Sequence, residues 1–338
     1  MSAPARSFPL KVGVALSGGG AAGMAHVGVI EELEEAGIRI SCVAGTSAGA
    51  MVGAAFANGQ LQAFRHTMCQ LTRTKVLRLF DPTWPQSGLL EGRRSLELVR
   101  PYLGTSIEAL PIPYAAVAAD LDTGEEIVLR SGPVAEAVRA SIAIPGLFTP
   151  QRVGTRILVD GGLVNPIPAD VARALGAEFV IAVSVLQVHP AVLPRKLNRS
   201  SLTQQWSERL RRRWQKPSPA PSRVLPEDNG HPAAELGLVE VLSRASTVVQ
   251  ARIAAARLRE QPPDFLIHVP VRLGLFDFHQ SREAIHTGRL AARAALPELL
   301  RALTEALPLV ERMQRWLDLA AARWSSGRQT AAHSKHQT

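Results

Sequence analysis

The sequence predicts an α/β fold with three layers, in which helices cover both faces of a central, mainly parallel sheet. Short apolar segments alternate with helical segments from residue 11 onward, and the connections between them are short. The first two apolar segments each end in a turn of small residues, and a helical segment follows each turn. A strand–helix–strand–helix order with short connections is typical of parallel strands with helices packed on the sheet. The 338 residues are enough for one large domain with a sizeable core.

The individual elements follow from apolar runs and from the residues that end helices. Gly37, Gly59 and Gly176 each follow a helical segment, where glycine commonly ends a helix. Asp122-Thr123-Gly124 separates two apolar segments in the way that a hairpin turn does. The predicted strands are residues 11–16, 38–44, 114–119, 126–129, 156–159, 179–185 and 265–269. The predicted helices are residues 21–36, 48–58, 61–79, 95–103, 134–141, 167–175, 233–260, 281–307 and 309–324.

The domain organisation is predicted from a change of composition near Val188. Residues 8–187 form the predicted catalytic core. Residues 188–229 are rich in Pro, Arg and Ser, so we expect a mobile insertion, with one basic amphipathic helix at about 202–214. Residues 230–324 return to helical patterns and are expected to complete the same domain, and residues 325–338 form a polar tail that we expect to be disordered.

Charge and composition limit the partners. The net charge of +9 comes largely from the segment between Arg195 and Arg223. It favours an anionic membrane surface over nucleic acid, for which no binding motif is present, and a solvated charged loop explains it equally well. Residues 1–9 do not resemble a signal peptide, and no apolar run reaches the ~18–20 residues of a membrane span. We expect a cytoplasmic protein, with peripheral membrane attachment as an alternative, and reduced thiols at Cys42 and Cys69.

Ser47 is the strongest candidate for a nucleophile. It lies in Gly45-Thr46-Ser47-Ala48-Gly49, a G-x-S-x-G pattern between a predicted strand and a predicted helix. In that context the turn exposes the hydroxyl, Gly45 and Gly49 remove obstructing side chains, and the helix N-terminus favours negative charge. A turn of small residues with an incidental serine is the alternative, because the chain is rich in Gly, Ala and Ser.

A second glycine-rich turn follows the first predicted strand. Gly18, Gly19, Gly20 and Gly23 can present backbone N–H groups to an anion, as an oxyanion hole does. The same residues satisfy G-x-G-x-x-G, which also occurs in dinucleotide-binding proteins. Dinucleotide binding requires an acidic residue at the end of the next strand. That strand ends at Ser47 instead, which favours an oxyanion hole beside a nucleophile.

Asp160 is the candidate base. None of the nine histidines lies in a setting that is distinctive of a Ser-His-Asp triad. Asp160 ends a predicted strand and precedes two glycines. If this strand is parallel to its neighbours, the carboxylate lies at the same sheet edge as Ser47. The alternative is an aspartate that only caps the next helix.

Taken together, these motifs resemble those of the patatin-like phospholipase family. Gly18–Gly23, Gly45–Gly49 and Asp160-Gly161-Gly162 match in order, and residues 141–148 and 165–168 also resemble family segments. The likeness covers about residues 11–185, with weaker similarity over 235–307. It implies a patatin-like fold, a Ser47–Asp160 dyad, an oxyanion hole in the glycine loop, and hydrolysis of acyl esters in (lyso)phospholipids or other lipids. It implies neither a metal nor a cofactor.

One position departs from the family pattern, which often has Arg or Lys where this chain has Ala22. Loss of that cation would alter the packing or the electrostatics of the loop but not its backbone donors. Two alternatives therefore stay open: a Ser-His-Asp esterase of the α/β-hydrolase type, and a catalytically weak lipid-binding or regulatory protein. The motifs do not distinguish phospholipase, lysophospholipase and acyltransferase.

Overall fold

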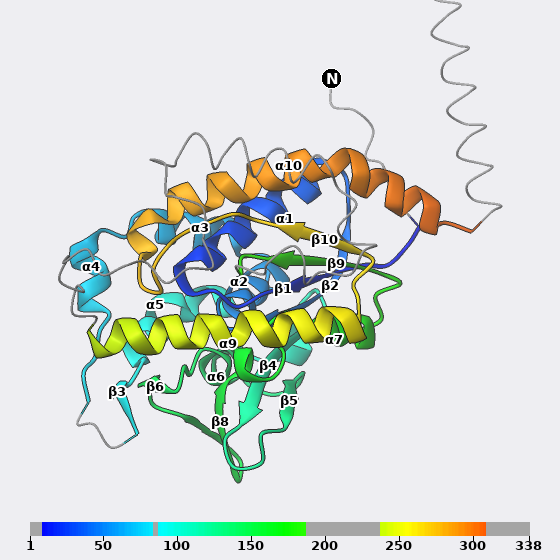
Figure 1. Cartoon of the computed structure of the whole chain (residues 1–338). Helices are drawn as coiled ribbons and strands as arrows, with labels where there is room; N and C mark the ends of the chain where they lie inside the picture. Colours follow the sequence, from blue (N-terminus) through cyan, green and yellow to red (C-terminus); the bar gives the residue numbers. More distant parts are fainter. Residues whose placement is uncertain (1–8, 84–86, 187–236, 309–338) are drawn as a thin grey trace, which may run out of the picture.

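An eight-stranded sheet forms the centre of the protein. The structure is a computed structural model and describes residues 9–83, 87–186 and 237–308 (Figure 1). The strand order is β10-β9-β1-β2-β4-β8-β7, and β5 pairs with the other side of β4. The strands of this sheet are β1 (Val12–Leu16), β2 (Ile40–Thr46), β4 (Tyr114–Asp120), β5 (Glu126–Leu129), β7 (Gln151–Val153), β8 (Arg156–Asp160), β9 (Phe179–Ser184) and β10 (Phe265–His268). A separate parallel pair consists of β3 (Gly88–Leu90) and β6 (Gly146–Phe148).

The sheet is parallel through its centre and antiparallel at one side. The pairings β10–β9, β9–β1, β1–β2 and β2–β4 are parallel. The pairings β4–β5, β4–β8 and β7–β8 are antiparallel. The prediction of a central, mainly parallel sheet is confirmed, but the assumption that the strand before Asp160 is parallel is wrong. A short β-hairpin from β7 to β8 reverses the chain direction there.

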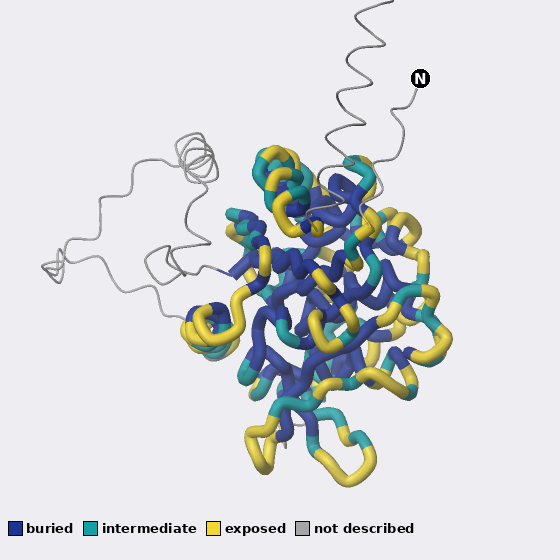
Figure 2. The backbone as a smooth tube through the Cα atoms, turned by 90° about the vertical axis from the view of Figure 1, so that its right-hand side faces the viewer, coloured by how far each residue is buried: buried dark blue, intermediate teal, exposed yellow. Residues whose placement is uncertain are grey.

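Helices cover both faces of the sheet, which confirms the three-layer prediction. The helices are α1 (Ala25–Glu35), α2 (Ala48–Ala57), α3 (Leu61–Cys69), α4 (Arg73–Arg78), α5 (Arg93–Leu103), α6 (Val134–Ser141), α7 (Ala169–Ala174), α9 (Leu238–Glu260) and α10 (Ser281–Ala306). Figure 2 shows the buried backbone at the centre, with exposed positions on the outer turns and loops. None of the helices in the described ranges is long and apolar enough to cross a membrane.

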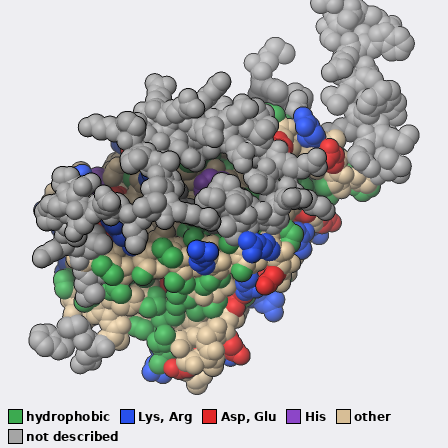
Figure 3. All heavy atoms as spheres, in the orientation of Figure 1, with side chains coloured by type: hydrophobic (Ala, Val, Ile, Leu, Met, Phe, Trp, Pro, Cys, Tyr) green, Lys and Arg blue, Asp and Glu red, His purple; other side chains and the backbone are tan. Residues whose placement is uncertain are grey.

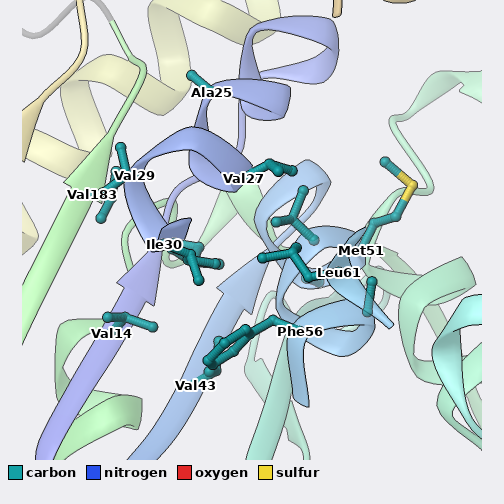
Figure 4. Packing of buried hydrophobic residues seen from close by; sticks show 14 of the residues in the cluster. Val14, Ala25, Val27, Val29, Ile30, Val43, Met51, Phe56, Leu61 and Val183 are labelled. Atoms are coloured by element: carbon teal, nitrogen blue, oxygen red, sulfur yellow. The ribbon is translucent and has the colours of Figure 1, made fainter. Parts of the chain in front are cut away.

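Successive side chains of β1 and β2 point to opposite faces of the sheet, where they belong to two different apolar clusters. Val14 and Val43 belong to the larger cluster, which includes residues of α1, α2, α3, α5 and α10. Figure 4 shows these two valines beside Ile30 of α1 and Phe56 of α2. Ala15 on the opposite face packs with residues of α7 and α9. This alternation is the period-two pattern of a strand that is buried on both faces.

The helices α1 and α10 pack in close contact because each has a glycine at the crossing. A Cβ atom at Gly28 would lie 2.0 Å from the Ile285 carbonyl oxygen, and one at Gly288 would lie 2.0 Å from that of Ala25. The C-terminal helix is thereby joined to the first helix of the fold.

Several element boundaries differ from the sequence prediction. The predicted helix at 61–79 is two helices, because the Thr72 side chain accepts a hydrogen bond from the Lys75 N–H and caps α4. The helix after β1 starts as a 3-10 turn, η1 (Gly20–Met24). The short strands β3, β6 and β7 have too few residues for a periodic signal. The predicted insertion (188–229), the basic helix at 202–214, the helix at 309–324 and the tail (325–338) lie outside the described residues.

Candidate active site

Ser47 occupies a strained turn between β2 and α2. Its φ of 55° is the only positive φ of a non-glycine residue in the described ranges. A Cβ atom at Gly45 would lie 2.4 Å from the Gly49 carbonyl oxygen, and one at Gly49 would lie 2.2 Å from that of Leu16. Only glycine fits at either position, so both residues allow the end of β2, the start of α2 and the end of β1 to pack together. Strain of this kind persists only where the surrounding structure imposes it, and it is common at functional sites.

The hydroxyl of Ser47 donates a hydrogen bond of 2.6 Å to Oδ2 of Asp160. The other carboxylate oxygen of Asp160 accepts a 2.7 Å hydrogen bond from the Gly162 N–H. Both side chains are buried, with Ser47 5% and Asp160 1% exposed. The structure therefore brings together two residues that are 113 positions apart in the sequence.

The antiparallel strand β8 brings Asp160 to Ser47. Asp160 pairs with Ala118 of β4, and the preceding residue of β4, Val117, pairs with Thr46 of β2. The last residue of β8 and the last residue of β2 thus pair with consecutive residues of β4, which brings the two strand ends together. The structure places Asp160 beside Ser47, but the expected reason, convergence of parallel strand ends, was wrong.

Burial raises the pKa of Asp160 to about 6, against the opposing effect of hydrogen bonds from Ser47 and the Gly162 N–H. A carboxyl group with this pKa is mostly ionised at neutral pH, and it is a stronger base than an exposed aspartate. The arrangement can therefore withdraw the proton of the Ser47 hydroxyl.

The glycine-rich turn lies directly beside this pair. A Cβ atom at Gly18 would be 3.5 Å from the Cβ of Ser47. The Gly18 N–H is not free, because it donates to the Pro166 carbonyl oxygen at 3.1 Å. Gly19 and Gly20 have φ values of 145° and 55°, and neither N–H has an acceptor among the residues that the structure describes. These two groups are the donors that the turn can offer to an anion.

Gly23, in the same turn, allows close packing against the start of α2. A Cβ atom there would lie 2.4 Å from the Cβ of Ala48, the first residue of α2. Gly23 thus lets η1 approach the helix that follows Ser47. Ala22, the position that departs from the family pattern, is 5% exposed and packs in the main apolar cluster.

An apolar pocket extends from Ser47. It encloses about 720 Å³, including the part that is open to solvent. Gly20 and Ser47 lie on its wall, and Ser95 is its other polar side chain. The remaining lining residues are apolar: Ala48, Met51, Met68, Leu71, Val76, Leu79, Phe80, Leu98, Val99, Ile142, Ile144, Phe148, Leu275, Phe276 and Phe278. A hydrocarbon chain fits such a lining, because it gains by leaving water and requires no hydrogen bonds.

Comparison with known proteins decides the family. A family model described as patatin-like phospholipase matches residues 14–173, which include the glycine turn, Ser47 and Asp160. An uncharacterized NTE family protein of Mycobacterium tuberculosis, Rv1063c, is 34% identical over 330 residues, covering 85% of this chain and 91% of that protein. The chain belongs to the patatin-like phospholipase family. Membership supports lipid esterase activity in general terms.

Other relatives of this patatin-like protein are longer. A second uncharacterized NTE family protein of Mycobacterium tuberculosis, Rv2565, is 36% identical, covering 86% of this chain and 48% of that protein. The neuropathy target esterase sws of Drosophila melanogaster is 34% identical over 182 residues, which are 52% of this chain and 13% of that protein. The similarity thus extends from bacterial proteins close to this chain in length to a small part of a much larger animal protein.

Ser141 and Gln250 were missed as site residues by sequence reasoning. The Ser141 hydroxyl accepts a 2.8 Å hydrogen bond from the Ser47 N–H and donates a 2.6 Å bond to the Val117 carbonyl oxygen. Gln250 of α9 is buried against two glycines of the site: a Cβ atom at Gly162 would lie 2.5 Å from its Cδ, and one at Gly18 would lie 3.1 Å from its Oε1. Ser141 lies in a segment that resembles the family but has no motif of its own, and Gln250 has no local signal.

We expect Ser141→Ala to destabilise this patatin-like protein by about 1–3 kcal/mol, because it leaves the Ser47 N–H and a strand carbonyl without a buried partner. Activity should fall as well, since the strained turn loses an anchor. Urea unfolding of wild type and variant measures the difference, with Ser131→Ala at an exposed position as the control. Equal unfolding midpoints for wild type and Ser141→Ala would show that the hydrogen bonds do not hold the turn.

No histidine in the described ranges hydrogen-bonds Ser47 or Asp160. The buried His26 contacts the residue before the glycine turn, because its Nε2 donates to the Ser17 carbonyl oxygen at 2.8 Å. Burial lowers the pKa of His26 to about 4, so that its ring is neutral at physiological pH. In the same ranges, no group of three or more His, Cys, Asp or Glu side chains is arranged to hold a metal ion.

Proposed function

We propose that the protein is a serine hydrolase that cleaves acyl esters of (lyso)phospholipids or other lipids through a Ser47–Asp160 dyad. The hydrogen bond of 2.6 Å between these two side chains, on the wall of an apolar pocket, is the observation that carries the proposal. It combines a nucleophile, a base and a space for an acyl chain at one place. Family membership supports the reaction class, and the dyad and the lipid substrates are our own inference.

The reaction proceeds in two displacement steps. Asp160 accepts the Ser47 proton as the hydroxyl oxygen bonds to the acyl carbon, and the carbonyl electrons move onto its oxygen. The N–H groups of Gly19 and Gly20 stabilise this oxyanion, while Gly18 and Gly23 hold the shape of the turn. Collapse breaks the bond to the leaving alcohol, which takes the proton from Asp160 and leaves an acyl-serine.

Hydrolysis of the acyl-serine completes the cycle. Asp160 accepts a proton from a water molecule as its oxygen attacks the acyl carbon. The fatty acid then leaves, and Ser47 recovers its proton from Asp160. No metal or cofactor enters these steps, since the base and the oxyanion donors belong to the chain itself.

A fluorophosphonate probe tests the proposal, because it phosphonylates activated serines. We expect one adduct, located at Ser47 by peptide mass spectrometry. Ser95→Ala, at another serine of the same pocket, should be labelled like wild type, and Ser47→Ala should not react. Absence of labelling in a folded protein that still binds lipid would instead favour the catalytically weak lipid-binding alternative.

A further inference from the structure

The short helix α4 has two dissimilar sides. Val76 faces inward and lines the apolar pocket, as do Leu79 and Phe80, which follow the helix. Leu77 faces outward and is 63% exposed, more than any other large hydrophobic side chain in the described ranges. Figure 1 shows α4 at one end of the molecule, away from the central sheet. More than half of this apolar side chain is therefore in contact with water.

Three cations lie on the same helix as Leu77. Arg73, Lys75 and Arg78 are exposed, and within the described ranges no carboxylate forms an ion pair with any of them. Arg73 donates a hydrogen bond to the His279 ring, and Lys75 donates one to the Gln70 carbonyl oxygen. The charge of the helix is therefore available to an external anion.

The Asp81 and Glu91 carboxylates, which follow α4 in the chain, bind partners other than its cations. The Asp81 carboxylate accepts hydrogen bonds from the backbone N–H groups of Gly92 and Arg94. Glu91 pairs with Arg93 at 2.6 Å. Three cations without an ion pair in the described ranges thus share a helix with an exposed leucine, on the outer side of a wall of the pocket that contains Ser47.

We propose that α4 docks the protein on an anionic lipid surface, with Leu77 in contact with the acyl chains and Lys75 and Arg78 against the head groups. Exposed apolar residues flanked by Lys and Arg bind at a bilayer interface in this way. On α9, Val248 is 62% exposed, but Arg244 of the same helix is paired with Glu240. Figure 3 shows hydrophobic side chains over α9, with Lys and Arg side chains towards its right-hand end. The inference rests on the proposed function only in that the pocket behind α4 receives lipid.

Vesicle sedimentation of the full chain carrying Ser47→Ala tests docking without any turnover of lipid. We expect binding to vesicles of phosphatidylcholine with about 30% phosphatidylglycerol, an anionic lipid. Binding should be weaker in high salt or to vesicles of phosphatidylcholine alone. Added Lys75→Gln and Arg78→Gln should weaken binding about 25-fold, since each cation near such a surface contributes about five-fold. Leu77→Ser should weaken it by roughly ten-fold through lost apolar burial.

Matched controls change the same residue types elsewhere. Arg130→Gln with Arg301→Gln removes two exposed cations, and Leu121→Ser removes a leucine that is 50% exposed. Both should bind vesicles like the parent. Equal binding of the α4 variants and these controls would overturn the proposal, as would failure of the parent to bind anionic vesicles.

Activity assays of α4 variants that retain Ser47 separate this proposal from the proposed function. The α4 variants should hydrolyse a soluble short-chain ester, p-nitrophenyl butyrate, at the wild-type rate and lose activity only on vesicles. Ester hydrolysis without α4-dependent vesicle binding overturns docking alone. Vesicle binding by a protein that hydrolyses no ester overturns the proposed function and leaves docking intact.

Discussion

Replacing Ser47 with alanine is expected to lower ester hydrolysis by on the order of 10⁴-fold or more, because the acyl-enzyme can no longer form. Hydrolysis of a lipid panel by wild type and variant measures the loss. Ser95→Ala is the matched control, since Ser95 lines the same pocket but has no hydrogen bond to Asp160. Undiminished hydrolysis by Ser47→Ala would refute the nucleophile assignment.

Ser47→Gly provides a second variant whose stability can be predicted. Glycine adopts the φ of 55° without the penalty that a side chain incurs. The variant should therefore be inactive and yet more stable than Ser47→Ala, by about 1 kcal/mol in the free energy of unfolding. A less stable Ser47→Gly would show that the turn is not strained by the side chain.

Asp160→Asn is expected to abolish most activity and to stabilise the protein at neutral pH. The amide cannot accept the Ser47 proton, although its oxygen can still accept from the Gly162 N–H and its NH₂ can donate to the Ser47 hydroxyl. At pH 7.5 the variant no longer has a buried charge that is paired only by hydrogen bonds. This combination of lost function and gained stability is common where an active site is built at the expense of stability.

The direction of the pH dependence follows from the raised pKa. Between the usual pKa of 3.8 and about 6, folded Asp160 retains a proton that the unfolded chain has lost. Stability therefore falls as the pH rises through this window, and the loss is complete above it. The shift corresponds to about 3 kcal/mol at ~1.4 kcal/mol per pKa unit.

Urea unfolding at pH 4 and pH 7.5 measures this difference. The free energy of unfolding of Asp160→Asn should exceed that of wild type by up to about 3 kcal/mol at pH 7.5, and the two should be almost equal at pH 4. Asp122→Asn, at an exposed turn position, should show no such change. In wild type, kcat/KM should decline below about pH 6 as Asp160 is protonated. An equal stability difference at both pH values would contradict the raised pKa.

Much of the fold and of the candidate site could be predicted from short sequence motifs. The strand–turn–helix around Ser47 is local, because glycine at positions 45 and 49 and a helical run after residue 47 leave few other conformations. The order of strands and helices followed from apolar patterns and helix-ending glycines in the same way. The break between α3 and α4 was missed because a cap at Thr72 competes weakly with a continuous helical pattern.

Asp160 shows which features of the site are specified locally by the sequence and which depend on strand pairing. Its position at the end of a strand before two glycines is written in the sequence, whereas the antiparallel direction of β8 depends on its pairing with β4 and β7. Strand direction is set by contacts between segments that are distant in the chain, and no local pattern specifies it.

From its order of residues alone, this chain specifies the turn that presents Ser47, the glycines beside it and the carboxylate of Asp160, because each depends on backbone conformation over a few neighbouring residues. Folding in three dimensions decides the rest: the pKa of Asp160, the support from Ser141, the packing of Gln250 against Gly162, the apolar pocket and the exposed cations of α4. Burial and long-range packing create these properties, and they arise only when distant segments exclude water from the same space.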